Sequence, residues 1–168
     1  MNLQTGDIVF VIGRGWVANT IRFFMGGIVN HVGIMYDEDT IFETDGKWRK
    51  AKFDTVNRYD WQNILVYRFN HITDEQQDEV MDLCESLEGR PYSYWECTVN
   101  AVFSVFNSRI RGKVASMLGN SRFMKCDEMV KYIVYRAFDF IHFKNHEAGD
   151  PNSMLETVQR STQFHRVL

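Results

Sequence analysis

The stretch NHVGIMYDEDTIFET, residues 30–44, constrains the fold most because it places two short apolar runs on either side of an acidic turn. β-Branched and aromatic residues in both runs favour strands, and residues 37–39 suit a tight turn between them. We therefore expect an antiparallel hairpin that returns Glu43 to the side of His31, since cross-strand neighbours lie roughly 5 Å apart. A carboxylate on an apolar strand is costly to bury unless it is paired, and the His31 imidazole is the expected partner.

Hydrophobic periodicity in the rest of the chain places strands early and helices late. Strands are expected at 6–12 and 63–69, with a short closing strand at 164–168. Helices are expected at 15–27, 72–89, 124–140 and 150–159, and an aromatic turn at 90–95 leads into another apolar helix. This order predicts an α+β fold rather than alternating βαβ units, built as one domain over residues 1–168.

The composition argues against several classes of protein. At 168 residues the chain is long enough for one domain with a real core. A formal net charge of −3 and a pI near 5.9 supply no phosphate-neutralising surface, so we expect no nucleic-acid partner. No apolar run reaches the length of about 18 residues that a membrane span needs. The N-terminus lacks a secretion-signal pattern, which predicts a cytoplasmic protein, with delivery by lysis or by a phage as the alternative.

Cys126 is the cysteine whose position suits chemistry. The three cysteines, Cys84, Cys97 and Cys126, have no CxxC pairing, so we expect no disulfide framework, no metal site and no cofactor. Cys84 and Cys97 fall in apolar helices and suit core packing. Cys126 stands where a helix begins, and the free N–H groups there stabilise a thiolate and can hold an oxyanion. A buried, inert cysteine is the alternative that position alone leaves equally open.

His31 is the best candidate for the base that a cysteine nucleophile needs. It opens a strand directly after a glycine-containing turn, where loops present functional groups. The other histidines occupy expected turns or an edge strand: His71, His142, His146 and His165.

Taken in order, the segments TGDIVFV, NHVGIMY, IFET, GRPYSYWE, KCDEMVKYI and DPNSML resemble the circularly permuted NlpC-like branch of the papain-like cysteine hydrolases, the YiiX-type proteins. Lecithin:retinol acyltransferase is a more distant relative of that branch. The match runs from Thr5 to about Leu155. The resemblance implies a circularly permuted papain-like (NlpC-type) α+β fold, in which helices pack a small antiparallel sheet or half-barrel.

The resemblance also implies roles for individual residues. Cys126 corresponds to the nucleophile, His31 to the base and Glu43 to the group that orients the base. The candidate substrate-binding residues are Tyr92, Tyr94, Asn30 and Asp127. The chain departs from the family pattern where Asp127 and Asn30 replace serines and Ser93 replaces an aspartate.

By this resemblance, the expected function is that of a cysteine peptidase or amidase that cleaves an amide bond through an acyl-enzyme. Its substrate would be a peptide, a peptidoglycan fragment or an acyl-amide. Two alternatives stay open. One is a lipid acyltransferase or thioesterase with the same triad, and the other is a non-catalytic domain that binds a ligand in a papain-like cleft. The oligomeric state is not predicted.

Overall fold

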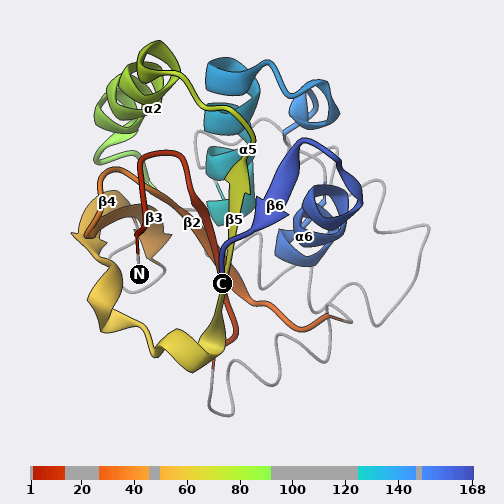
Figure 1. Cartoon of the computed structure of the whole chain (residues 1–168). Helices are drawn as coiled ribbons and strands as arrows, with labels where there is room; N and C mark the ends of the chain where they lie inside the picture. Colours follow the sequence, from red (N-terminus) through yellow and green to blue (C-terminus); the bar gives the residue numbers. More distant parts are fainter. Residues whose placement is uncertain (1, 14–26, 46–49, 92–124, 147–148) are drawn as a thin grey trace, which may run out of the picture.

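The structure is a computed structural model, and it describes residues 2–13, 27–45, 50–91, 125–146 and 149–168 (Figure 1). The strands are β1 (Ile8–Val11), β2 (His31–Met35), β3 (Thr40–Asp45), β4 (Lys50–Thr55), β5 (Ile64–Phe69) and β6 (Phe164–Arg166). The α-helices are α2 (Asp74–Leu87), α5 (Cys126–Phe138) and α6 (Pro151–Arg160). Short 3₁₀ helices are η1 (Val56–Arg58), η2 (Trp61–Asn63) and η3 (Ile141–Phe143).

The six strands form one sheet in the order β4-β3-β2-β1-β5-β6, and every pair of neighbours is antiparallel. The first strand therefore lies near the middle of the sheet, between β2 and β5, where both of its edges are hydrogen-bonded. The last strand closes one edge, as expected for the C-terminal segment. The α+β class and the hairpin of residues 30–44 are confirmed, whereas β4 is a strand that the sequence analysis did not predict.

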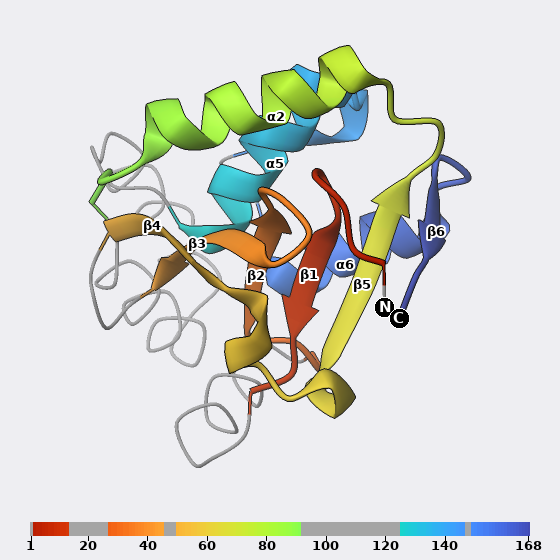
Figure 2. The same ribbon diagram turned by 60° about the vertical axis from the view of Figure 1, so that its left-hand side comes forward.

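The two faces of the sheet are buried differently, because side chains alternate along each strand. Ile8, Phe10 and Phe42 point to the face on which α2, α5 and α6 pack, and this layer forms the larger core. Figure 2 shows α2 and α5 lying across that face. Val9 and Ile41 point to the opposite face, where a smaller core is covered by the N-terminal segment, η1 and the C-terminus.

Local capping explains where the helices begin. The Thr73 hydroxyl accepts from the Gln76 N–H at 3.3 Å, and the Gln76 side chain accepts from the Thr73 N–H at 3.1 Å, which completes the expected capping box of α2. Asp150 caps α6 in front of a proline at its first position. The expected helix at 15–27 lies outside the described residues except for Gly27. The aromatic turn and helix after Pro91, with Cys97, lie outside them as well.

Among the described residues, the helices are too short or too polar to cross a lipid bilayer.

Candidate active site

The hairpin brings His31 and Glu43 into direct contact. Strands β2 and β3 pair with Ile34 opposite Phe42 and Met35 opposite Ile41. Extending this register places Glu43 opposite Gly33, so His31 is its diagonal neighbour on the same face of the sheet. His31 Nε2 lies 2.7 Å from Glu43 Oε2, which is hydrogen-bond distance for an imidazole and a carboxylate.

Gly33 lets the two strands approach at this point. A Cβ atom on Gly33 would lie 2.7 Å from Ile41 Cδ1 and 3.1 Å from the Phe42 carbonyl oxygen. Any larger residue would therefore push against β3 immediately before Glu43. The missing side chain thus helps to set the distance between His31 and Glu43.

Glu43 is fully buried, and it meets three donors. Besides His31, Arg58 Nη1 donates to Oε1 at 2.9 Å and the Tyr59 hydroxyl donates to Oε2. Burial alone would raise the pKa of Glu43, but the hydrogen bonds from His31 and Tyr59 and the charge of Arg58 hold the pKa below its usual range. Glu43 is therefore a carboxylate, which accepts hydrogen bonds and does not donate them.

Arg58 and Tyr59 are site residues that the sequence analysis missed. They lie at the end of η1, directly after β4, and they reach Glu43 only because that turn folds under the hairpin. The one signal in the sequence is Glu43 itself, since a buried carboxylate needs more than one donor.

The third residue of the cluster is Cys126, which lies on α5. It is the first residue of α5 and is 4% exposed, and α5 packs against β2 and β3. Its thiol lies close enough to His31 to influence the pKa of the imidazole. Burial by itself lowers the pKa of His31, but its interactions with the Cys126 thiol and with the Glu43 carboxylate raise it from 6.5 to about 10. The site therefore favours an imidazolium between a sulfur and a carboxylate.

Asp127 and Asn30 are engaged with the protein itself. The Asp127 side chain is 2% exposed, and its Oδ2 lies 2.7 Å from Lys131 Nζ, one turn further along α5. This ion pair balances the carboxylate that the sequence placed beside the thiol. The Asn30 side chain accepts a hydrogen bond from the Gly13 N–H at 2.5 Å and so ties β2 to the end of β1. Tyr92 and Tyr94 lie outside the described residues.

Asn152 holds the segment that leads into β2. Its Oδ1 accepts from the Val29 N–H and its Nδ2 donates to the Val29 carbonyl, both at 3.0 Å. The amide thus acts like one more strand residue beside Val29, two residues before His31. A Cβ atom on Gly27 would lie 1.9 Å from Asn152 Cγ, so the glycine makes room for this clamp.

We expect Asn152→Ala to lower the free energy of unfolding by about 2 kcal/mol, because it leaves both backbone groups of the fully buried Val29 without these partners. Urea unfolding at neutral pH measures the change. Gln62→Ala, at an exposed amide in η2, is the control and should change stability little. Equal stability of both variants would contradict the clamp.

The remaining thiol and histidines of the described residues have other surroundings. Cys84 is fully buried in the core, and burial raises the pKa of its thiol above the ordinary range. His165 Nδ1 lies 2.7 Å from Asn70 Oδ1 at the edge of the sheet. His146 packs edge-on against Tyr132. Of these groups, none belongs to the Cys126–His31–Glu43 cluster.

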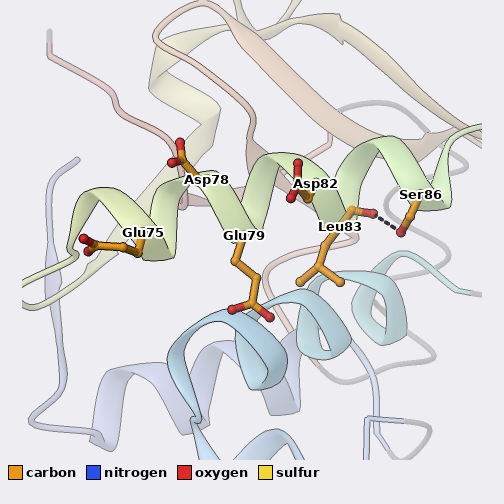
Figure 3. Close-up of a pocket in the computed structure, with 6 residues that line it drawn as sticks. All are labelled: Glu75, Asp78, Glu79, Asp82, Leu83 and Ser86. Carbon is orange, nitrogen blue, oxygen red and sulfur yellow. Dashed lines mark hydrogen bonds between the residues drawn. The ribbon is translucent and has the colours of Figure 1, made fainter.

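A surface depression lies along α2, lined by Glu75, Asp78, Glu79, Asp82, Leu83 and Ser86. Figure 3 shows these side chains spaced along one helix, with the Ser86 hydroxyl donating to the Leu83 carbonyl at 2.8 Å. Its residues are separate from the Cys126–His31–Glu43 cluster. It is the polar face of an amphipathic helix.

Comparison with solved structures identifies the architecture. The metalloprotein YiiX from Escherichia coli O157:H7, a DUF1105 protein, matches with a TM-score of 0.65 and 16% sequence identity, covering 100% of this chain and 98% of that chain. The chain has a YiiX-like fold. The YiiX-type architecture expected from the ordered motifs is therefore confirmed at the level of fold. No family model and no curated protein matches the chain.

The YiiX neighbour is described as a metalloprotein. Within the part of this chain that the structure describes, no group of three or more His, Cys, Asp or Glu side chains is arranged to hold a metal ion.

Proposed function

We propose that the protein is a thiol hydrolase of the amidase or peptidase type, with Cys126 as nucleophile, His31 as acid and base, and Glu43 as the orienting group. The observation that carries the proposal is the hydrogen bond from His31 Nε2 to Glu43 at 2.7 Å, with Cys126 at the start of the helix that packs on the strands of this pair. The effect of the Cys126 thiol on the pKa of His31 supports it. A nucleophile, a base and an oriented third group in this order define a triad by geometry. The YiiX-like fold and the ordered motifs support a circularly permuted papain-like (NlpC-type) domain over residues 1–168.

The proposed reaction starts from a preformed ion pair. Because the pKa of His31 is about 10, the imidazole carries a proton at neutral pH, and we assign to its positive charge the role of stabilising a thiolate on Cys126. His31 Nε2 is hydrogen-bonded to Glu43, so we assign Nδ1 as the ring nitrogen that interacts with the sulfur. The ion pair is the state in which a cysteine attacks without first losing its proton.

In the first step the sulfur bonds to the carbonyl carbon and the π electrons move to the oxygen. The N–H groups at the start of α5 are the donors that we assign to this oxyanion. On collapse, the carbon–nitrogen bond breaks and His31 gives its proton to the departing amine. Neutral His31 then takes a proton from water, the hydroxide displaces the sulfur, and the acid and the ion pair are regenerated.

The substrate class follows from the resemblance alone: a peptide, a peptidoglycan fragment or an acyl-amide. Tyr92 and Tyr94, which the resemblance assigns to the pocket, lie outside the described residues. Asp127 is not included among the substrate contacts of this proposal, because its charge is balanced by Lys131 in a buried pair.

The test uses p-nitrophenyl acetate, a small ester that reports acylation without a known physiological substrate. We expect a burst of one p-nitrophenolate per protein, followed by slower turnover, and an acetyl group on Cys126 by peptide mass spectrometry. Cys126→Ala should lose the burst. Cys84→Ala is the matched control and should keep it, since that thiol is buried in the core.

A burst that survives in Cys126→Ala would contradict the assignment of the nucleophile. A wild-type protein that shows neither a burst nor acetylated Cys126 would contradict the hydrolase proposal.

A further inference from the structure

Glu43 needs more than His31 to remain a buried carboxylate in a fixed orientation. Its side chain is fully buried, so water cannot solvate its charge. Three donors replace that water, and they approach the two oxygens from different residues: His31 and Tyr59 at Oε2, Arg58 at Oε1. Rotation of the carboxylate away from His31 would therefore break at least one further hydrogen bond.

We propose that Tyr59 and Arg58 are positioning residues that act on Cys126 and His31 through Glu43. Their two hydrogen bonds keep the carboxylate ionised and hold Oε2 toward His31 Nε2. This inference rests on the proposed function for its biological meaning, but the physical coupling that it states does not require turnover.

The turn that carries both residues is itself held in place. Val56 is buried in the smaller core, and its N–H donates to the Asp39 carbonyl at 2.9 Å. The Thr55 hydroxyl caps the turn by accepting from the Asn57 N–H at 3.3 Å. The Tyr59 N–H then donates to the Val56 carbonyl at 3.1 Å. The backbone is thereby fixed immediately before the phenol that reaches Glu43.

Arg58 is oriented from two further sides. Asp54 of β4 forms an ion pair with the same guanidinium nitrogen that donates to Glu43. The guanidinium carbon lies 5.2 Å from the centre of the Tyr59 ring, within cation–π range. Arg58 is therefore held before it meets Glu43, which lowers the entropy lost on forming that contact.

The titratable groups around Glu43 either contact it directly or contact one of its partners. His31 from β2, Arg58 from η1 and Tyr59 contact Glu43 directly. Asp54 and Lys52 of β4 pair with each other, and Asp54 also pairs with Arg58. Cys126 of α5 interacts with His31 and not with Glu43 in the described contacts. The tyrosine hydroxyl is thus a neutral donor to Glu43, and its removal changes no formal charge in the cluster.

Tyr59→Phe tests the inference with two measurements on the full chain. The first is the titration of Glu43 by side-chain carbon NMR. The second is the rate of Cys126 alkylation by iodoacetamide as a function of pH, read by peptide mass spectrometry. Loss of a hydrogen bond to a carboxylate should raise the Glu43 midpoint by about one pH unit. The alkaline step of the Cys126 profile, at which His31 loses its proton, should move to lower pH, because a carboxylate that Tyr59 no longer holds toward Nε2 stabilises the imidazolium less.

Tyr36→Phe is the matched control. The Tyr36 hydroxyl also donates to a glutamate, Glu85 Oε1 at 2.7 Å, but it lies beyond the opposite end of β2 from His31. This variant should leave both measurements unchanged. Arg58→Lys keeps the positive charge while losing the planar donor, and it should move both midpoints in the same direction as Tyr59→Phe by a smaller amount.

A Glu43 midpoint that moves while the Cys126 profile stays in place would overturn the inference, because the hydrogen bond would then be structural only. Unchanged values for both would overturn it too. Coupled shifts in a wild-type protein that shows no acylation by p-nitrophenyl acetate would support this inference while rejecting the hydrolase proposal. The two failures are therefore distinguishable.

Discussion

His31→Gln is expected to make the alkylation of Cys126 steeply dependent on pH. In the wild-type protein the pKa of His31 is about 10, so the imidazolium persists beside the sulfur across the neutral range. We expect a rate that is nearly constant from about pH 6 to 8. Without the imidazolium, a thiol of ordinary pKa, about 8.5, loses thiolate roughly tenfold for each unit below that value. The variant should therefore slow about tenfold per pH unit over the same range.

Two controls attribute the change in pH dependence to His31. Alkylation of Cys84 in the same samples should be slow in both proteins, because burial raises the pKa of that thiol. The profile should be recorded for native protein, with circular dichroism to show that His31→Gln remains folded. Parallel wild-type and variant profiles would rule out His31 as the group that holds the proton of the pair.

The same histidine also affects stability with a defined sign. The pKa of His31 is raised from 6.5 to about 10 on folding, so its stabilising contribution is complete below pH 6.5 and is lost as pH rises through about 10. The difference in free energy of unfolding between wild type and His31→Gln should accordingly narrow over that window. A difference that widens toward pH 10 would contradict the assigned direction.

Arg68→Met is expected to lower the free energy of unfolding by about 3 kcal/mol. Asp7 is fully buried beside the central strand β1, and Arg68 holds it with two bonds, Nε to Oδ1 at 2.7 Å and Nη2 to Oδ2 at 2.8 Å. Removing one partner of such a pair leaves an unpaired buried charge, which costs roughly 3–5 kcal/mol. The lower end applies because the Arg68 side chain is 19% exposed. Methionine preserves most of the aliphatic length, so lost packing contributes little.

Urea unfolding at neutral pH measures this effect, and the surface offers a matched control. Arg160 pairs with Glu156 at 3.4 Å, and both side chains are mostly exposed. Arg160→Met should be nearly neutral, since exposed ion pairs contribute little. Adding Asp7→Asn to Arg68→Met should recover part of the loss, because the unpaired charge disappears. An equal loss of stability in both arginine variants would show that the Asp7–Arg68 pair stabilises the fold no more than an exposed ion pair does.

The contact between His31 and Glu43 could be predicted because it is local. A short acidic turn separates the two strands, and the alternation of apolar residues sets which side chains share a face. The start of the helix at Cys126 was likewise readable from apolar spacing. These features depend on residues that are close in sequence, so tertiary packing has little freedom to alter them.

Arg58, Tyr59 and Asn152 could not be found in this way. Asn152 is hydrogen-bonded to Val29 although 123 positions separate them in the chain, and neither segment contains a pattern that predicts this contact. Arg58 and Tyr59 read as surface residues of a polar stretch. They contact Glu43 because burial of Val56 in the smaller core holds the following turn beside the carboxylate.

The sequence by itself determined the α+β class, the hairpin and the helix that begins at Cys126, because hydrophobic periodicity and capping act over a few residues. The tertiary structure alone decided that β1 lies inside the sheet, that α5 brings Cys126 to His31, and that Arg58 and Tyr59 enclose Glu43. These contacts depend on which apolar faces bury one another. That choice is made by the whole core, and no short segment encodes it.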